Sequence, residues 1–164
     1  MGWKDEDFLE DLREKTRRGM LGQVKRGLSP GGRAYGYRSA PIYDETKRDA
    51  YGQPLVVGYR RAVNPEEAAT VRRIFEMYAA GQSPKTIAHR LNDESVPPPR
   101  WRDGAPQRGW TWSTINGSPK KAIGILNNRL YVGRLVWNRS CKVRDPDAGK
   151  RITCARPGSE WVYG

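Results

Sequence analysis

The expected fold depends most on the stretch GILNNRLYVGRLVWN, which spans Gly124–Asn138. It opens with an apolar Ile-Leu pair and an Asn-Asn break that begins at Asn127. The following run, Leu130–Trp137, is rich in aliphatic and aromatic residues, which strands favour. The stretch therefore predicts a turn from a helix into a strand.

Upstream of this stretch, the strongest pattern is that of a helix over Asn64–Ala80. It opens with an Asn cap, a Pro at its first position and two Glu residues in its first turn. Its apolar residues Val71, Ile74, Phe75 and Tyr78 recur at helical spacing. This periodicity predicts a helix with one face buried.

Two more helices are expected between this helix and the opening stretch. Ser83–Glu94 begins with Ser-Pro and turns Ile87, Ala88 and Leu91 inward. A shorter helix begins at Trp112. The three helices together predict a helix-turn-helix-like set with an enlarged turn.

The N-terminal part predicts a long helix followed by two strands. The helix is expected over Asp5–Arg26, with an acidic first half and a basic second half, the order that the helix dipole favours. Its apolar stripe is too thin to bury it in a core. The run Ser29–Gly32 ends it. The strands, Ala34–Tyr43 and Pro54–Arg61, are joined by a charged, exposed connection.

These elements predict an α+β fold that is mostly helical. It has a long N-terminal helix, a helix-turn-helix-like core and a small antiparallel β-sheet. We expect three regions: the N-terminal helix over residues 1–30, a domain over 31–139, and a polar, Gly- and Pro-punctuated linker over 140–164.

The charge balance favours a polyanionic partner. The chain has 30 Lys and Arg against 18 Asp and Glu, a net charge of +12, and a pI near 10.0. A merely soluble, highly charged domain is the alternative. Because the basic residues are clustered, nucleic-acid binding is the preferred interpretation.

Several other classes of function are excluded. The single histidine, His89, leaves no nucleophile–base–orienter triad, and no phosphate-binding Gly-x-x-x-x-Gly-Lys loop occurs. Cys141 and Cys154 lack the paired spacing of a zinc site. We therefore predict no catalytic residues, no metal and no cofactor. With no apolar run of membrane-spanning length and no secretory signal, we expect a cytoplasmic protein without a membrane partner.

One group of candidate DNA-binding residues lies along the end of the first helix and the Gly-rich loop. No acidic residue occurs between Lys15 and Arg38, and the Gly31-Gly32 pair lets the backbone approach a phosphate. A solvated basic face is the alternative. The group comprises Arg17, Arg18, Lys25, Arg26, Arg33 and Arg38.

A second group surrounds the start of the third helix. Short hydroxyls and an amide there suit base edges, and lysines suit phosphate or guanine. The serine serves equally well as a helix cap. This group comprises Ser113, Thr114, Asn116, Lys120 and Lys121, and the irregular basic loop before it adds Arg100, Arg102 and Arg108.

Aromatic residues stand among these cations. Tyr35, Tyr37 and Trp112 are expected to pack in the core. For Trp101, packing and stacking on DNA stay equally open.

Three segments resemble the recombinase domain of large serine recombinases, the group of phage integrases and transposon resolvases. The first contains KTRRGM and GRAYGY within Lys15–Tyr37. The second contains NPEEAATVRRIFEMY and IAHRLN within Asn64–Asn92. The third is Trp112–Asn138. Together they span most of the chain.

The resemblance implies that the chain binds double-stranded DNA at an attachment site. The helix end and loop would follow the minor groove and the domain would dock in the adjacent major groove, giving DNA roles to Arg17, Arg18, Arg33 and the segment from Ser113 to Lys121. It also implies that the nucleophilic serine belongs to a preceding catalytic domain and that a zinc domain follows. The chain itself would then not be an enzyme. Its partners would be DNA, the parent catalytic domain and other recombinase subunits.

Two further hypotheses fit the same residues. A free-standing helix-turn-helix transcriptional regulator would dimerise through the thin stripe of the first helix. A basic RNA-binding domain would use the same charge and the same Trp and Tyr content.

Overall fold

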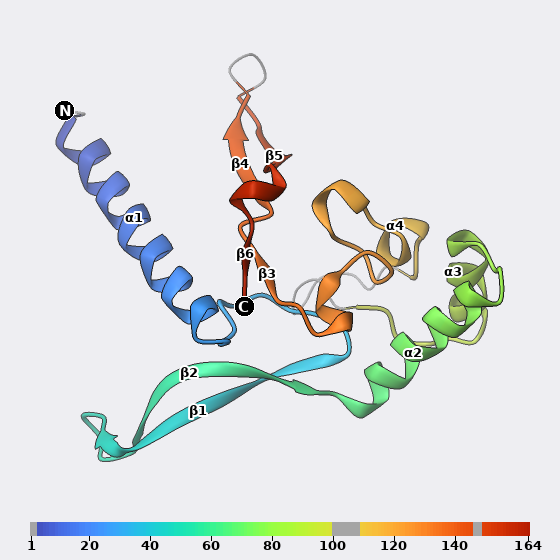
Figure 1. Cartoon of the computed structure of the whole chain (residues 1–164), viewed down its shortest axis with the longest axis horizontal. Helices are drawn as coiled ribbons and strands as arrows, with labels where there is room; N and C mark the ends of the chain where they lie inside the picture. Colours follow the sequence, from blue (N-terminus) through green and yellow to red (C-terminus); the bar gives the residue numbers. More distant parts are fainter. Residues whose placement is uncertain (1–2, 100–108, 146–148) are drawn as a thin grey trace.

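The structure, a computed structural model, describes residues 3–99, 109–145 and 149–164. It combines a long N-terminal helix, a cluster of helices and small antiparallel sheets, so the predicted α+β class is confirmed. Figure 1 shows two extended elements, helix α1 and the β1–β2 hairpin, that project away from the helical cluster. No helix in the described part of the chain is long and apolar enough to cross a membrane.

Helix α1 spans Trp3–Lys25 and is attached to the rest of the fold near its C-terminal end. Phe8, Leu9 and Leu12 are exposed on it, as the thin stripe predicted, whereas Val24 is fully buried. Val24 lies against Gly164, where an added Cβ would collide with the Val24 carbonyl oxygen. Gln23 also lies against Gly58 of the hairpin, whereas residues 8–20 of α1 are exposed.

The hairpin consists of β1 (Tyr37–Arg48) and β2 (Pro54–Val63), paired antiparallel. Both expected strands are confirmed with shifted bounds. β1 begins three residues later because Ala34 accepts a hydrogen bond from the Tyr37 amide and the chain turns at Gly36, whose φ is +86°. β1 also extends into the expected loop, so that the turn narrows to the residues around Asp49.

The helical cluster is built from α2 (Pro65–Ala79), α3 (Pro84–Asp93) and α4 (Trp112–Ile115). The inward face predicted for α3 is confirmed. On α2, Met77 completes the buried row, whereas Tyr78 is 49% exposed. The buried core consists of Val71, Ile74, Met77, Ile87, Ala88, Leu91, Trp110, Ile115 and Ile125.

The start of α4 differs from expectation. Thr111, not Ser113, is the cap: it has extended backbone and its hydroxyl accepts from the Thr114 amide at 3.2 Å. The expectation that Trp112 packs in the core is wrong, because its side chain is 52% exposed. Trp110 is buried instead, and its indole N–H donates to the Val96 carbonyl at 2.9 Å.

Substitutions at Thr111 and Ser113 test which of the two residues caps α4. Thr111→Ala is expected to lower the free energy of unfolding by about 1 kcal/mol, because the Thr114 amide loses its acceptor. Ser113→Ala, two positions along, is the matched control and is expected to change it much less. Urea unfolding monitored by circular dichroism measures both. A larger loss for Ser113→Ala would restore Ser113 as the cap.

The expected strand over Leu130–Trp137 is also wrong in its first half. Arg129–Val132 form a 3₁₀ helix, because the Asn128 side chain accepts from the Leu130 amide at 3.2 Å and caps the turn. Gly133 then adopts a left-handed conformation with φ +79°. Only Val136–Trp137 remain extended, as β3.

Residues 140–164 carry regular structure where a linker was expected. β4 (Ser140–Arg144) and β5 (Arg151–Ala155) form a hairpin, and β6 (Val162–Tyr163) pairs with β3. A short 3₁₀ helix, Gly158–Glu160, joins β5 to β6. Within the described ranges the chain therefore forms three separate two-stranded sheets rather than one.

Candidate nucleic-acid interface

A pocket of about 1150 Å³ lies where the loop after α1 meets the helical cluster. Its wall includes the loop residues Arg33 and Arg38 and, from α4, Ser113 and Thr114. These four residues belong to the two groups that the sequence proposed for DNA contact. The fold brings them to one place although they lie far apart along the chain.

The charged residues of the pocket are mainly cationic. Four arginines line it, against two carboxylates, which leaves a net charge of 4 − 2 = +2. One of the carboxylates, Glu67, accepts a hydrogen bond from the Gly36 amide at 2.8 Å. The arginines are Arg33, Arg38, Arg61 and Arg139, and the carboxylates are Glu66 and Glu67.

Arg61 comes from β2 and is held by the backbone of the Gly-rich loop. Its guanidinium donates to the carbonyls of Gly31, at 3.2 Å, and Gly32, at 3.5 Å. Its Nε is buried without a hydrogen-bond partner. Partial burial lowers the pKa of Arg61, although the group remains charged at neutral pH.

Arg139 lies between β3 and β4 and lines the same pocket. Its guanidinium donates to the Ala122 carbonyl. Burial, and after it the positive charge of Arg61, lower the pKa of Arg139. Neither arginine forms an ion pair with a described carboxylate.

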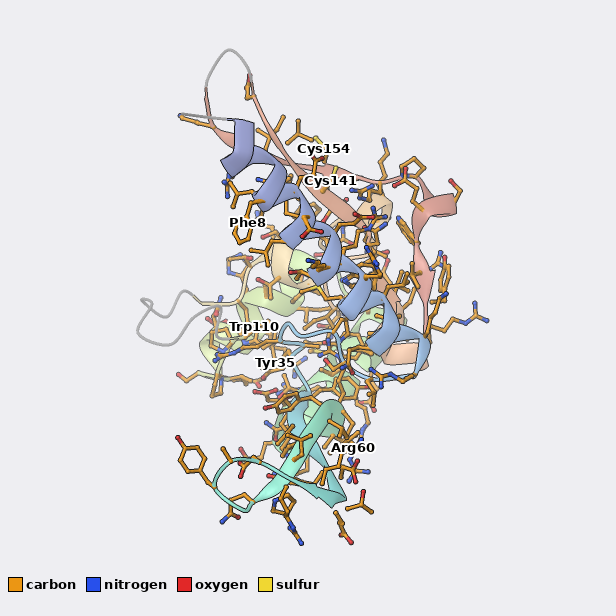
Figure 2. The ribbon with its side chains drawn as sticks, turned by 90° about the vertical axis from the view of Figure 1, so that its left-hand side faces the viewer. Phe8, Tyr35, Arg60, Trp110, Cys141 and Cys154 are labelled. Atoms are coloured by element: carbon orange, nitrogen blue, oxygen red, sulfur yellow. The ribbon has the colours of Figure 1, made fainter. Side chains whose placement is uncertain are left out.

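Three tyrosines line the pocket, and hydrogen bonds to backbone carbonyls hold two of them in place. The Tyr131 hydroxyl donates to the Tyr35 carbonyl at 2.7 Å, and the Tyr35 hydroxyl donates to the Pro97 carbonyl at 2.9 Å. The rings of Tyr37 and Tyr131 stack with centroids 6.0 Å apart. Burial raises the pKa of Tyr131, so its hydroxyl is a neutral donor. The expectation that Tyr35 packs in the core is confirmed, because its ring contacts Trp110 edge-on. Figure 2 labels the two residues.

Two glycines place Ser113 and Thr114 at the pocket. After α4 the chain makes a short loop and returns, and Gly117 and Gly124 cross with their backbones in contact, both at positive φ. The returning segment is hydrogen-bonded to α4, since the Ile125 amide donates to the Thr114 carbonyl at 3.1 Å. The exposed end of α4 is thereby fixed beside the Gly-rich loop.

Other proposed residues lie outside the pocket. Arg17, Arg18 and Lys25 are exposed along α1, as is Arg26 directly after it, and Arg18 pairs with Glu14 at 3.8 Å.

On the loop after α4, one proposed side chain is bonded within the protein: the Lys121 ammonium donates to the Thr153 carbonyl at 3.1 Å. At Asn116 the backbone carbonyl accepts from the Asn127 side-chain amide at 2.7 Å, a contact that does not involve the Asn116 side chain. Lys120 is exposed. Arg100, Arg102, Arg108 and Trp101 lie outside the described residues.

No sequence pattern marks Arg61 and Arg139 as site residues. One stands in an ordinary strand pattern and the other just after the Trp137 strand end. Only the folded chain shows that the Gly-rich loop and the Ala122 turn hold them at one pocket. Reasoning from charge clusters misses such residues because their neighbours in sequence differ from their neighbours in space.

Metal and redox groups are sparse in the part of the chain that the structure describes. No group of three or more His, Cys, Asp and Glu side chains comes together there in a way that could hold a metal ion. Cys141 and Cys154 face each other across β4 and β5 as free thiols. His89 is exposed on α3, away from the pocket. What the pocket and α1 offer chemically is cationic and hydroxyl hydrogen-bond donors for an anionic ligand.

Comparison with known proteins gives one match. A family model described as Recombinase matches residues 65–162, from the start of α2 to the first residue of β6. No curated protein sequence and no solved structure matches the chain. The matched range contains the α4 candidates, whereas the basic end of α1 and the Gly-rich loop precede it.

Proposed function

Because this chain belongs to the Recombinase family, we propose that it binds double-stranded DNA as the recombinase domain of a site-specific serine recombinase. Membership supports a role in site-specific DNA recombination. The proposal adds that this chain positions the enzyme on its attachment site, in the cytoplasm, through helix-turn-helix-like contacts. Its partners would be DNA, the catalytic domain and other recombinase subunits.

One observation carries the proposal: residues from two distant segments line the same pocket. Arg33 and Arg38 flank the start of the hairpin, and Ser113 and Thr114 belong to α4. The arginines suit phosphates, and the short hydroxyls of Ser113 and Thr114 suit base edges. A duplex lying over the pocket would therefore meet both kinds of side chain. The exposed basic residues of α1 would extend the phosphate contacts along the DNA.

We propose that the chain binds DNA and does not cleave it. Among the described residues that line it, the pocket holds two carboxylates and four arginines but no histidine or cysteine. In the resembled family the nucleophilic serine belongs to a separate catalytic domain. Strand cleavage is accordingly assigned to that domain.

The test is binding of the purified chain to a labelled duplex that contains an attachment half-site, obtained by selection from random duplexes. We expect tighter binding to the selected duplex than to random DNA. We also expect log K to fall linearly with log salt, at about −0.9 for each phosphate neutralised. Fluorescence anisotropy over a salt series measures both quantities.

Arg38→Gln tests the pocket within the same assay. It is expected to flatten the salt dependence by up to about 0.9 on both duplexes, because a phosphate contact is sequence-independent. Lys85→Gln removes an exposed positive charge from α3, outside the pocket, and serves as the matched control. No salt-dependent binding to any duplex would overturn the proposed function.

The same assay separates the competing hypotheses. Tighter binding to a structured RNA of equal length would favour an RNA-binding domain. A tight dimer without DNA in analytical ultracentrifugation would favour a free-standing regulator.

A further inference from the structure

Arg61 and Arg139 are two like charges that line the same pocket. They come from β2 and from the residue range between β3 and β4. The positive charge of Arg61 contributes to lowering the pKa of Arg139. Each guanidinium is about half buried in the fold, so their repulsion is screened less than it would be at an open surface.

No carboxylate among the described residues forms an ion pair with either guanidinium. Glu67, the acidic residue that bonds the Gly36 amide, does not, and neither does Glu66. Buried or half-buried charges in proteins are normally paired, so two cations without a described carboxylate partner at one pocket favour a bound anion as their counter-charge.

The two groups are also held in fixed orientations. The carbonyls of Gly31 and Gly32 accept from the two Nη atoms of Arg61, and the Ala122 carbonyl accepts from Arg139. A guanidinium carries five N–H donors, so donors of both residues remain unused. On Arg61 each Nη carries a second N–H beside the one that meets a glycine carbonyl, whereas the Nε is buried. A fork oriented by the backbone loses little conformational entropy when it binds an oxygen anion.

We infer that Arg61 and Arg139 together bind one phosphodiester of the DNA backbone, inside the pocket and between the Gly-rich loop and the Ala122 turn. The inference rests on the proposed function. Planar forks match the oxygens of a phosphate in a bidentate arrangement, and a phosphodiester supplies one negative charge between the two cations. The contact would fix the register of the duplex relative to α4 without reading its sequence.

The test uses the full chain and a fluorescein-labelled random-sequence duplex, because a phosphate contact does not depend on sequence. Arg61→Gln and Arg139→Gln are each expected to weaken binding roughly tenfold or more. The double variant is expected to flatten the log K against log salt slope by about 0.9, the value for one phosphate. Because the two residues share one phosphate, the double variant should lose less than the sum of the two single losses.

The matched control is Arg60→Gln. Arg60 precedes Arg61 on β2, is exposed, and does not line the pocket; Figure 2 labels it on the hairpin. It is expected to leave the slope unchanged. If Arg60→Gln flattened the slope as much as Arg61→Gln, total charge rather than this pair would govern binding, and the inference would be overturned.

Thermal unfolding monitored by circular dichroism shows whether the glutamine variants fold normally. If they do not, lysine variants at the same positions test the contact instead. Arg61→Lys and Arg139→Lys keep the charge but lose the fork, so we expect a retained salt slope with weaker binding. Unchanged affinity in all the pocket variants, with normal duplex binding by the wild-type chain, would overturn the phosphate contact alone. Absence of any duplex binding by the wild-type chain would overturn the proposed function and this inference with it.

Discussion

The Trp110→Ala variant is expected to lose about 3–5 kcal/mol of unfolding free energy, the cost of removing a large buried aromatic side chain. Trp110 is 3% exposed, contacts Tyr35 edge-on at 5.2 Å between ring centroids, and donates to the Val96 carbonyl. A loss of this size is a large part of the stability of a domain. The variant is therefore expected to unfold at much lower urea concentration.

The matched control for this variant is Trp112→Ala. It removes the same side chain two residues later, where 52% of it is exposed, and should cost much less. Urea titration monitored by tryptophan fluorescence and circular dichroism compares the two. Equal losses would mean that the assignment of Trp110 rather than Trp112 to the core is wrong.

The second large effect is expected for Gly124→Ala. Gly124 has φ +89°, and a Cβ there would lie 2.5 Å from the Asn116 carbonyl carbon and oxygen and the Gly117 nitrogen. These are backbone atoms, so no side chain can move aside. We expect a loss of about 3 kcal/mol or more, from the left-handed conformation and the collision together.

Gly133→Ala separates the two contributions. Gly133 has a similar φ of +79° but no heavy atom within 4 Å of an added Cβ. Its loss should be about 1 kcal/mol, from backbone conformation alone. Thermal unfolding of the two variants measures the difference. A Gly124→Ala protein as stable as Gly133→Ala would show that the two segments do not cross in contact.

The elements predicted well are those whose signals are local. The cap, the Pro and the apolar spacing of α2 act within one helix, and both α2 and α3 lie within a residue or so of their expected bounds. The same holds for α1, whose exposed apolar stripe matched its composition. For these helices, the residues that decide the structure are also neighbours in sequence.

The elements predicted poorly depend on distant partners. Leu130–Trp137 has strand-like composition, yet Tyr131 bonds the Tyr35 carbonyl and Asn128 caps a 3₁₀ turn instead. β3 and β6 exist because the C-terminal segment returns to pair with Val136–Trp137, which composition does not reveal. Tertiary contacts outweighed propensity in both cases.

The residues of the candidate site also fall into those that local sequence patterns predict and those that depend on distant contacts. Charge clustering identified Arg33 and Arg38, and helix position identified Ser113 and Thr114, and the fold places all four at one pocket. Their role in DNA binding remains a prediction. Arg61 and Arg139 were not found, because what distinguishes them is the backbone carbonyls that hold them and their nearness to each other.

Gly164, the residue after β6, contacts Val24 near the C-terminal end of α1. The end of the chain therefore packs against the base of this helix. Twenty-three helical residues extend roughly 35 Å, so a tilt of about ten degrees at this joint displaces the opposite tip of α1 by about 6 Å. A small change in the position of β3 and β6 that tilts α1 would therefore displace the Trp3 end of the helix by several ångströms. The position of the Trp3 end of α1 therefore depends on a contact made by residues at the other end of the sequence.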